Sequence, residues 1–132
     1  MSQTTRKRRV VLAEDNDEMR KVIHELIEGL GLEVSEVSSG ADLVRVLSED
    51  KPVDLLVTDV RMPWLSGLEV SLSMRRVDLN IPILVVSAFG DDHLREQVEK
   101  LGNATFLDKP FKAEEFLSIV SKLLLSYTTV KT

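Results

Sequence analysis

The stretch VVLAED, residues 10–15, decides the fold, because four apolar residues are followed directly by two carboxylates. The pattern returns in LLVTD, residues 55–59, and in ILVVS, residues 83–87, which ends in a hydroxyl. A fourth short apolar run, residues 104–107, precedes the sequence DKP at residues 108–110. Polar side chains at the ends of successive apolar runs are typical of an open parallel sheet, which binds ligands beyond the carboxyl ends of its strands. The sequence therefore predicts one site assembled from residues far apart in the chain.

Apolar runs alternate with segments of helical period along most of the chain. The predicted strands are residues 9–14, 33–37, 54–58, 81–86 and 104–107, and the predicted helices are residues 17–30, 41–49, 67–76, 91–101 and 114–125. Asn16 or Asp17 suits the N-cap of the first helix, and Gly31 suits its left-handed end. The fourth helix has a thin apolar stripe, which makes it easy to shift or to dock.

This strict alternation predicts an α/β fold in which helices cover both faces of a parallel sheet. Five strands fit the flavodoxin-like, doubly wound order 2-1-3-4-5, flanked by five helices, with a crevice between the first and third strands. In that order Glu14, Asp15 and Asp59 become neighbours. The acidic cluster is thus a consequence of the predicted topology.

Length and composition indicate a single globular domain of 132 residues. We expect the domain to span residues 9–125, between a flexible basic lead-in at residues 1–8 and a flexible tail at residues 126–132. The formal charge of −5 argues against general nucleic-acid binding. The basic run at residues 6–9 could be a nucleic-acid or localisation patch, but a solvated lead-in to the first strand is the favoured interpretation.

The absence of cysteine excludes disulfides, thiolate metal sites and a cysteine nucleophile. No apolar stretch reaches the ~18–20 residues that span a bilayer, and the polar start lacks the apolar middle of a secretory signal. We therefore expect no membrane contact and a cytoplasmic location.

The predicted cluster of three carboxylates needs a cation, because like charges at close range disfavour ionisation. Hard oxygen ligands without histidine or cysteine favour Mg²⁺, which typically also takes substrate phosphate. Lys109 and Ser87 suit phosphate oxygens, one as a charge and one as a hydroxyl donor. Each residue alone could be a helix cap or a turn, but their joint placement indicates phosphoryl transfer, with a carboxylate as acceptor.

Four motifs in order resemble the receiver domain of two-component response regulators, over about residues 8–125. Residues 11–16, VLAEDN, are similar to its acidic pocket, and residues 59–69, DVRMPWLSGLE, to its phosphorylation stretch. Residues 85–88, VVSA, match its switch strand, and residues 109–111, KPF, its lysine motif.

The resemblance implies that Asp59 accepts a phosphoryl group from a phosphohistidine or a small phosphodonor. Asp15, Asp59 and the backbone carbonyl of Arg61 would bind Mg²⁺ directly, and Glu14 would hold its waters. The domain would catalyse only its own phosphorylation and slow dephosphorylation, and would not be an enzyme otherwise.

The resemblance also implies a switch. Lys109 would pair with the phosphoryl group, and a cis peptide bond between Lys109 and Pro110 would aim it at the crevice. Ser87 would move towards the phosphoryl group while Phe106 turns inward. A contact that forms in only one of two conformations shifts the equilibrium towards that conformation. We expect the output surface to involve the fourth helix, the fifth strand and the last helix.

Departures from the family pattern are small. Glu14 replaces a frequent Asp, and Phe106 replaces a frequent Tyr. Trp64, in the loop after Asp59, is either a surface aromatic packed on a neighbour or a partner contact. His24 and His93 lack the surroundings of a catalytic histidine, and His24 is expected at solvent or on the helix flank.

The expected partners are a sensor histidine kinase or phosphotransfer protein, as in a phosphorelay, and a downstream effector domain or protein. Two other functions compete: a receiver-like adaptor that is never phosphorylated, and a flavin- or nucleotide-binding enzyme on the same topology. The sequence lacks the glycine-rich fingerprints of the latter. It leaves open whether the domain dimerises on phosphorylation, and whether it stands alone or belongs to a longer regulator.

Overall fold

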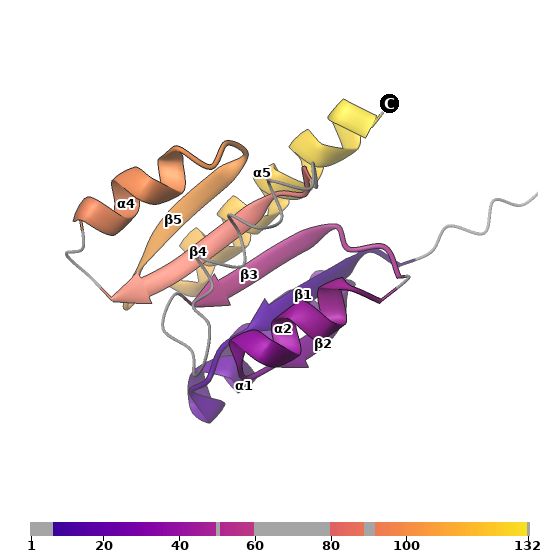
Figure 1. The fold of residues 1–132 in the computed structure, drawn as a ribbon, viewed down its shortest axis with the longest axis horizontal. Helices are drawn as coiled ribbons and strands as arrows, with labels where there is room; N and C mark the ends of the chain where they lie inside the picture. Colours follow the sequence, from indigo (N-terminus) through magenta and orange to yellow (C-terminus); the bar gives the residue numbers. More distant parts are fainter. Residues whose placement is uncertain (1–6, 50, 60–79, 89–91, 132) are drawn as a thin grey trace, which may run out of the picture.

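The computed structural model describes residues 7–49, 51–59, 80–88 and 92–131 (Figure 1). The strands are β1 (Arg9–Ala13), β2 (Glu33–Val37), β3 (Leu55–Asp59), β4 (Ile83–Ala88) and β5 (Ala104–Lys109). The helices are α1 (Asp17–Glu28), α2 (Gly40–Leu47), α4 (Asp92–Glu99) and α5 (Ala113–Lys131). The helix predicted at residues 67–76 lies outside the described residues.

The five described strands form one parallel sheet in the order β2-β1-β3-β4-β5, as the sequence predicts. The strands are in register at their carboxyl ends: Ala13 pairs with Thr58, Asp59 with Val86, and Ser87 with Asp108. This register places the polar residues at the carboxyl ends of β1, β3, β4 and β5 along one end of the sheet.

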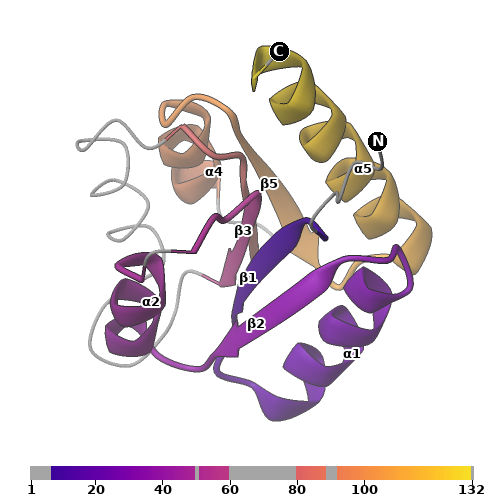
Figure 2. The same ribbon diagram turned by 90° about the vertical axis from the view of Figure 1, so that its right-hand side faces the viewer.

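Helices α1 and α5 cover one face of the sheet, and α2 and α4 cover the other (Figure 2). Ile23, Ile27, Phe116 and Val120 are buried on the first face. The second face buries two residues from each helix, namely Leu43, Val46, Leu94 and Val98. Every residue of β1 is buried, as expected for a strand covered on both faces.

Helix α1 begins at the predicted cap, since the Asn16 side chain accepts a hydrogen bond of 2.8 Å from the Met19 amide. The helix ends at Glu28, earlier than predicted, with Gly29 as its C-cap. Gly31 follows with φ of 81°, a conformation that glycine adopts without strain. The loop after the helix therefore turns where the sequence predicts, two residues beyond the cap.

Two expectations about the ends of the chain's elements are corrected. Helix α5 continues to Lys131, beyond the end predicted for the last helix at residue 125. Arg9 is not part of a solvated lead-in, because it is only 4% exposed. Its Nε donates to Ser35 Oγ at 3.0 Å. Arg8 is also engaged, because its Nη1 donates to the Leu124 carbonyl of α5 at 3.1 Å. Arg8 and Arg9 of the basic run thus contribute to the fold.

No helix within the described residues has the length and apolar content that a membrane span requires.

Candidate functional site

The carboxyl ends of β1 and β3 bring three carboxylates together. Glu14 follows β1, Asp15 begins the loop to α1, and Asp59 ends β3. Each offers one oxygen, and these oxygens all lie within 4.8 Å of one another. Glu14 is buried and Asp15 is exposed, so the cluster reaches from the sheet edge to the surface. The predicted acidic cluster is present.

Lys109, the last residue of β5, reaches across the sheet edge to this cluster. Its Nζ lies 2.7 Å from Glu14 Oε1 and 3.0 Å from Asp59 Oδ2. The Lys109–Pro110 peptide bond is cis, as predicted. One ammonium group therefore connects the ends of β1, β3 and β5, which are separated by up to 95 residues in the sequence.

The surroundings of these groups shift their protonation equilibria. Burial raises the pKa of Glu14, and the Asp59 charge acts in the same direction, against hydrogen bonds from Lys109 and the Asn16 amide. Burial by itself would lower the pKa of Lys109, but hydrogen bonds and charges from Glu14 and Asp59 outweigh it and raise the pKa. The pocket thus keeps its cation firmly charged and carries more carboxylate than this one ammonium neutralises.

The donor set fits a hard divalent cation. Glu14, Asp15 and Asp59 offer only carboxylate oxygens at mutually close positions, which are the ligands that Mg²⁺ prefers. Arg61, whose carbonyl was predicted as a further ligand, lies outside the described residues. The three carboxylates predicted to hold the ion or its waters all lie in this cluster.

The other predicted residues lie on the neighbouring strands. Ser87 is buried in β4, one position beyond the residue that pairs with Asp59. Phe106 is buried in β5 at 8% exposure and packs in the core between the sheet and α4. Arg95 of α4 covers the Phe106 ring and pairs with Asp108 of β5. Phe106 thus lies under a cation that sequence reasoning did not identify.

Residues 10–121 match the family model for the response regulator receiver domain. The chain belongs to this family. The receiver assignment made from the four motifs is therefore confirmed, together with its place in two-component signal transduction.

Two curated relatives show how far the similarity extends. Nodulation protein W of Bradyrhizobium diazoefficiens is 34% identical over 111 residues, which cover 84% of this chain and 48% of that protein. The chain thus spans about half the length of that relative. The response regulator receiver protein CpdR of Brucella abortus is 29% identical over 119 residues, which cover 90% of this chain and 98% of CpdR.

The fold is shared with solved receiver structures. The response regulator receiver domain protein from Clostridium thermocellum superimposes with a TM-score of 0.85 at 22% identity. The match covers 93% of this chain and 98% of that one. At this identity the likeness supports the fold alone.

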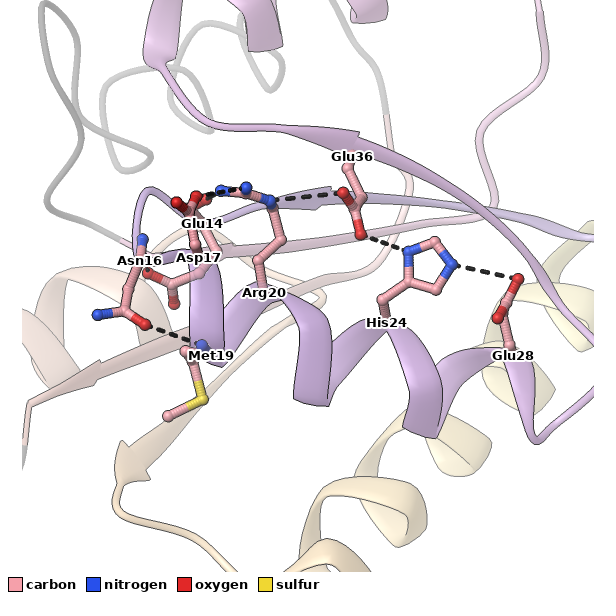
Figure 3. Close-up of polar contacts among 8 residues, drawn as sticks. All are labelled: Glu14, Asn16, Asp17, Met19, Arg20, His24, Glu28 and Glu36. Atoms are coloured by element: carbon pink, nitrogen blue, oxygen red, sulfur yellow. Dashed lines mark hydrogen bonds and ion pairs between the residues drawn. The ribbon is translucent and has the colours of Figure 1, made fainter.

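Sequence reasoning missed two arginines and a histidine that contact the site or its supports. Arg20 donates from Nη1 to the Glu14 backbone carbonyl at 2.8 Å, and His24 lies between Glu28 and Glu36 (Figure 3). A charged residue on a helix carries no signal of its own, since solvated arginines look the same in a sequence. Trp64 lies outside the described residues.

Proposed function

We propose that this receiver domain is a phosphorylation-dependent signalling switch that accepts a phosphoryl group on Asp59. The observation that carries the proposal is the Lys109 ammonium group, 2.7 Å from Glu14 and 3.0 Å from Asp59. A cation in this position can follow a phosphoryl oxygen once Asp59 is modified, because it already lies within hydrogen-bond distance of the acceptor carboxylate.

In the transfer, a carboxylate oxygen of Asp59 attacks phosphorus and the bond from phosphorus to the donor's leaving atom breaks. With a phosphohistidine donor, the electron pair of the P–N bond returns to the imidazole nitrogen. Mg²⁺ at Asp15 and Asp59, with Glu14 on its waters, would supply charge neutralisation. Lys109 holds the transferred group, and the buried Glu14 keeps the ammonium in place.

The switch follows from charge. Phosphorylation adds about −1.5 to −2 charges and strong acceptor oxygens at the end of β3. The Ser87 hydroxyl gains a partner there only in the phosphorylated state, and Lys109 exchanges its contact with the Asp59 carboxylate for one with a phosphoryl oxygen. A rearranged Ser87 leaves space for Phe106 on the neighbouring strand, which would alter the surface of α4, β5 and α5. We propose this surface as the contact for a downstream effector, and a sensor histidine kinase or phosphotransfer protein as the donor.

Intact-mass spectrometry after incubation with acetyl phosphate and Mg²⁺ tests the proposal. The wild type should gain the mass of one phosphoryl group, in a form that hydroxylamine removes, as for an acyl phosphate. Asp59→Asn should gain none, and Asp42→Asn, which changes an α2 carboxylate outside the cluster, should behave as the wild type. Equal labelling of Asp59→Asn would refute the acceptor assignment, and no labelling of any variant would favour the phosphorylation-independent adaptor.

A further inference from the structure

A chain of charged side chains runs from the acidic pocket along α1 to the edge strand β2 (Figure 3). It starts at Arg20, whose Nη1 donates to the Glu14 carbonyl at 2.8 Å. The Nη2 atom of the same guanidinium lies 2.6 Å from Asp17 Oδ1, and its Nε lies 3.4 Å from Glu36 Oε1. Arg20 thus contacts the backbone that carries the acidic pair and is itself held by two carboxylates.

His24 occupies the next turn of α1 and continues the chain. Its Nδ1 lies 2.5 Å from Glu36 Oε2, and its Nε2 lies 3.1 Å from Glu28 Oε2. The side chain is 26% exposed, which is intermediate for a helix-surface position. Glu36 therefore accepts from Arg20 with one oxygen and from His24 with the other.

The two carboxylates require two donors from the imidazole ring. Neutral histidine carries one N–H, whereas the imidazolium carries two. Only the protonated ring can therefore donate to Glu28 and Glu36 together. Burial lowers the pKa of His24, but hydrogen bonds and charges from the two glutamates outweigh it and raise the pKa above its ordinary value.

We propose that His24 is a positioning residue for the acidic pocket: its imidazolium fixes Glu36, Glu36 fixes the Arg20 guanidinium, and Arg20 fixes the carbonyl of Glu14. Loss of the ring proton then loosens the peptide between Glu14 and Asp15. The inference rests on the proposed function, because its expected effect is a change in Mg²⁺ affinity at the acidic pocket.

We call the linked contacts of His24, Glu36, Arg20 and the Glu14 carbonyl the clamp. The charges around His24 support a clamp that depends on the second proton of the imidazole ring. Within the described residues, α1 contributes Asp17, Arg20, Lys21, Glu25 and Glu28 to the groove around His24, and β2 contributes Glu36. With the ring neutral, four carboxylates in this groove face only two cations. With the ring charged, Glu36 is balanced on both of its oxygens. The position of Glu36 should therefore change when the ring titrates.

The backbone of Glu14 translates this change to the pocket. Its amide donates to the Val37 carbonyl at the end of β2, at 3.1 Å, and its carbonyl accepts from Arg20. The peptide that leads to Asp15 is thus held on the strand side by β2 and on the helix side by Arg20. When Arg20 no longer contacts the Glu14 carbonyl, only the hydrogen bond from the Glu14 amide to Val37 remains of these two contacts.

The sign of the pH dependence follows from linkage. Because the pKa of His24 is raised in the folded protein, the clamp is fully closed below the ordinary histidine value of about 6.5. It opens as the pH rises through the folded-state pKa. A pH-dependent loss of Mg²⁺ affinity is therefore expected on the alkaline side of that value.

The test measures Mg²⁺ affinity, with the metal alone, by isothermal titration calorimetry between pH 6 and pH 9. The wild type should bind Mg²⁺ about threefold more tightly than His24→Gln at pH 6, in the range carried by side-chain networks. The two proteins should converge at pH 9. In an Arg20→Gln background the His24→Gln change should have no further effect, since the contact that links it to Glu14 is gone.

Two further measurements separate positioning from general stability. The His24 pKa, followed by NMR of the imidazole ring, should exceed about 6.5 and should fall in Glu36→Gln. Lys21→Gln lies in the same groove, and no contact between Lys21 and His24 is among the described interactions. It is the matched control and should leave the Mg²⁺ pH profile unchanged.

Parallel Mg²⁺ profiles for the wild type and His24→Gln would overturn the proposal, and so would a His24 pKa at or below the ordinary value. Failure of Asp59 to accept a phosphoryl group would refute the proposed function alone. Mg²⁺ affinity and the NMR titration would still decide the role of His24, because neither requires phosphorylation.

Discussion

The guanidinium carbon of Arg95 in α4 lies 4.7 Å from the centroid of the Phe106 ring in β5. The same guanidinium pairs with Asp108, whose Oδ1 is buried and has no hydrogen-bond partner among the described residues. A single side chain therefore joins α4 to the strand that carries Phe106. The thin apolar face of α4 buries only Leu94 and Val98 among the described residues, and the Arg95 contact adds to this packing.

Replacement of Arg95 by Met should loosen α4. The change removes a partly exposed cation–π contact and an ion pair, which together contribute about 1 kcal/mol to the free energy of unfolding. Urea denaturation measures the loss. Arg95→Lys keeps a charge near Asp108 but lacks the flat guanidinium. Its unfolding free energy should lie between the values for the wild type and Arg95→Met. An unchanged midpoint for Arg95→Met would contradict this account.

Replacement of Phe116 by Ala should be the most damaging change in α5. Phe116 is fully buried and stacks on Phe111 with ring centroids 5.4 Å apart. The cavity left behind should cost about 3–5 kcal/mol of unfolding free energy. Leu125→Ala, on the same helix at 68% exposure, is the control and should stay within about 0.5 kcal/mol of the wild type. Similar losses for both variants would show that burial does not set the cost.

Mg²⁺ should raise the melting temperature of the wild type. A ligand that binds only the folded state stabilises it by about 2.7 kcal/mol at a hundred times its dissociation constant. Asp15→Asn should lose most of this response, because it removes a carboxylate from the cluster of three. Calorimetry with Mg²⁺, followed by a chelator to reverse the shift, provides the measurement. An equal shift in both proteins would place the ion elsewhere.

The unfolding free energy should also depend on pH through His24. Its pKa is raised in the folded state by Glu28 and Glu36 against the opposing effect of burial. The stabilisation is therefore complete below about pH 6.5 and disappears as the pH rises through the folded-state pKa. Urea titrations at several pH values measure the effect. The unfolding free energy of the wild type should exceed that of His24→Gln at pH 6, and the two values should become equal at alkaline pH. A constant difference would mean that the ring acts through packing.

The strands and the acidic pocket were predictable because they depend on local patterns. An apolar run followed by a carboxylate, as at Glu14 and Asp59, indicates both the strand and the edge at which it ends, and the parallel topology brings these edges together. The contacts of Arg95 and His24 were not predictable in this way. They depend on how a helix is rotated against a strand that follows later in the chain, and charge patterns in a sequence do not specify that rotation.

Helix α1 shows the same limit. Val22 is apolar and lies next to Ile23 in the sequence, but it is 51% exposed, whereas Ile23 and Ile27 are buried. The helix covers strands near the sheet margin, where a narrow stripe is sufficient. The positions beside that stripe are free to carry charge, and His24 is one of them. The site was therefore predicted in its ligands and missed in its supports.

The margin strand β2 presents Glu33 and Glu36 as its exposed side chains. An unprotected outer strand invites pairing with another polypeptide, and carboxylates there discourage such growth. Glu36 consequently serves solubility as well as the contacts with Arg20 and His24. Variants that neutralise Glu36 must be monitored for aggregation, since protein lost to pairing between exposed β2 strands would look like a loss of signalling.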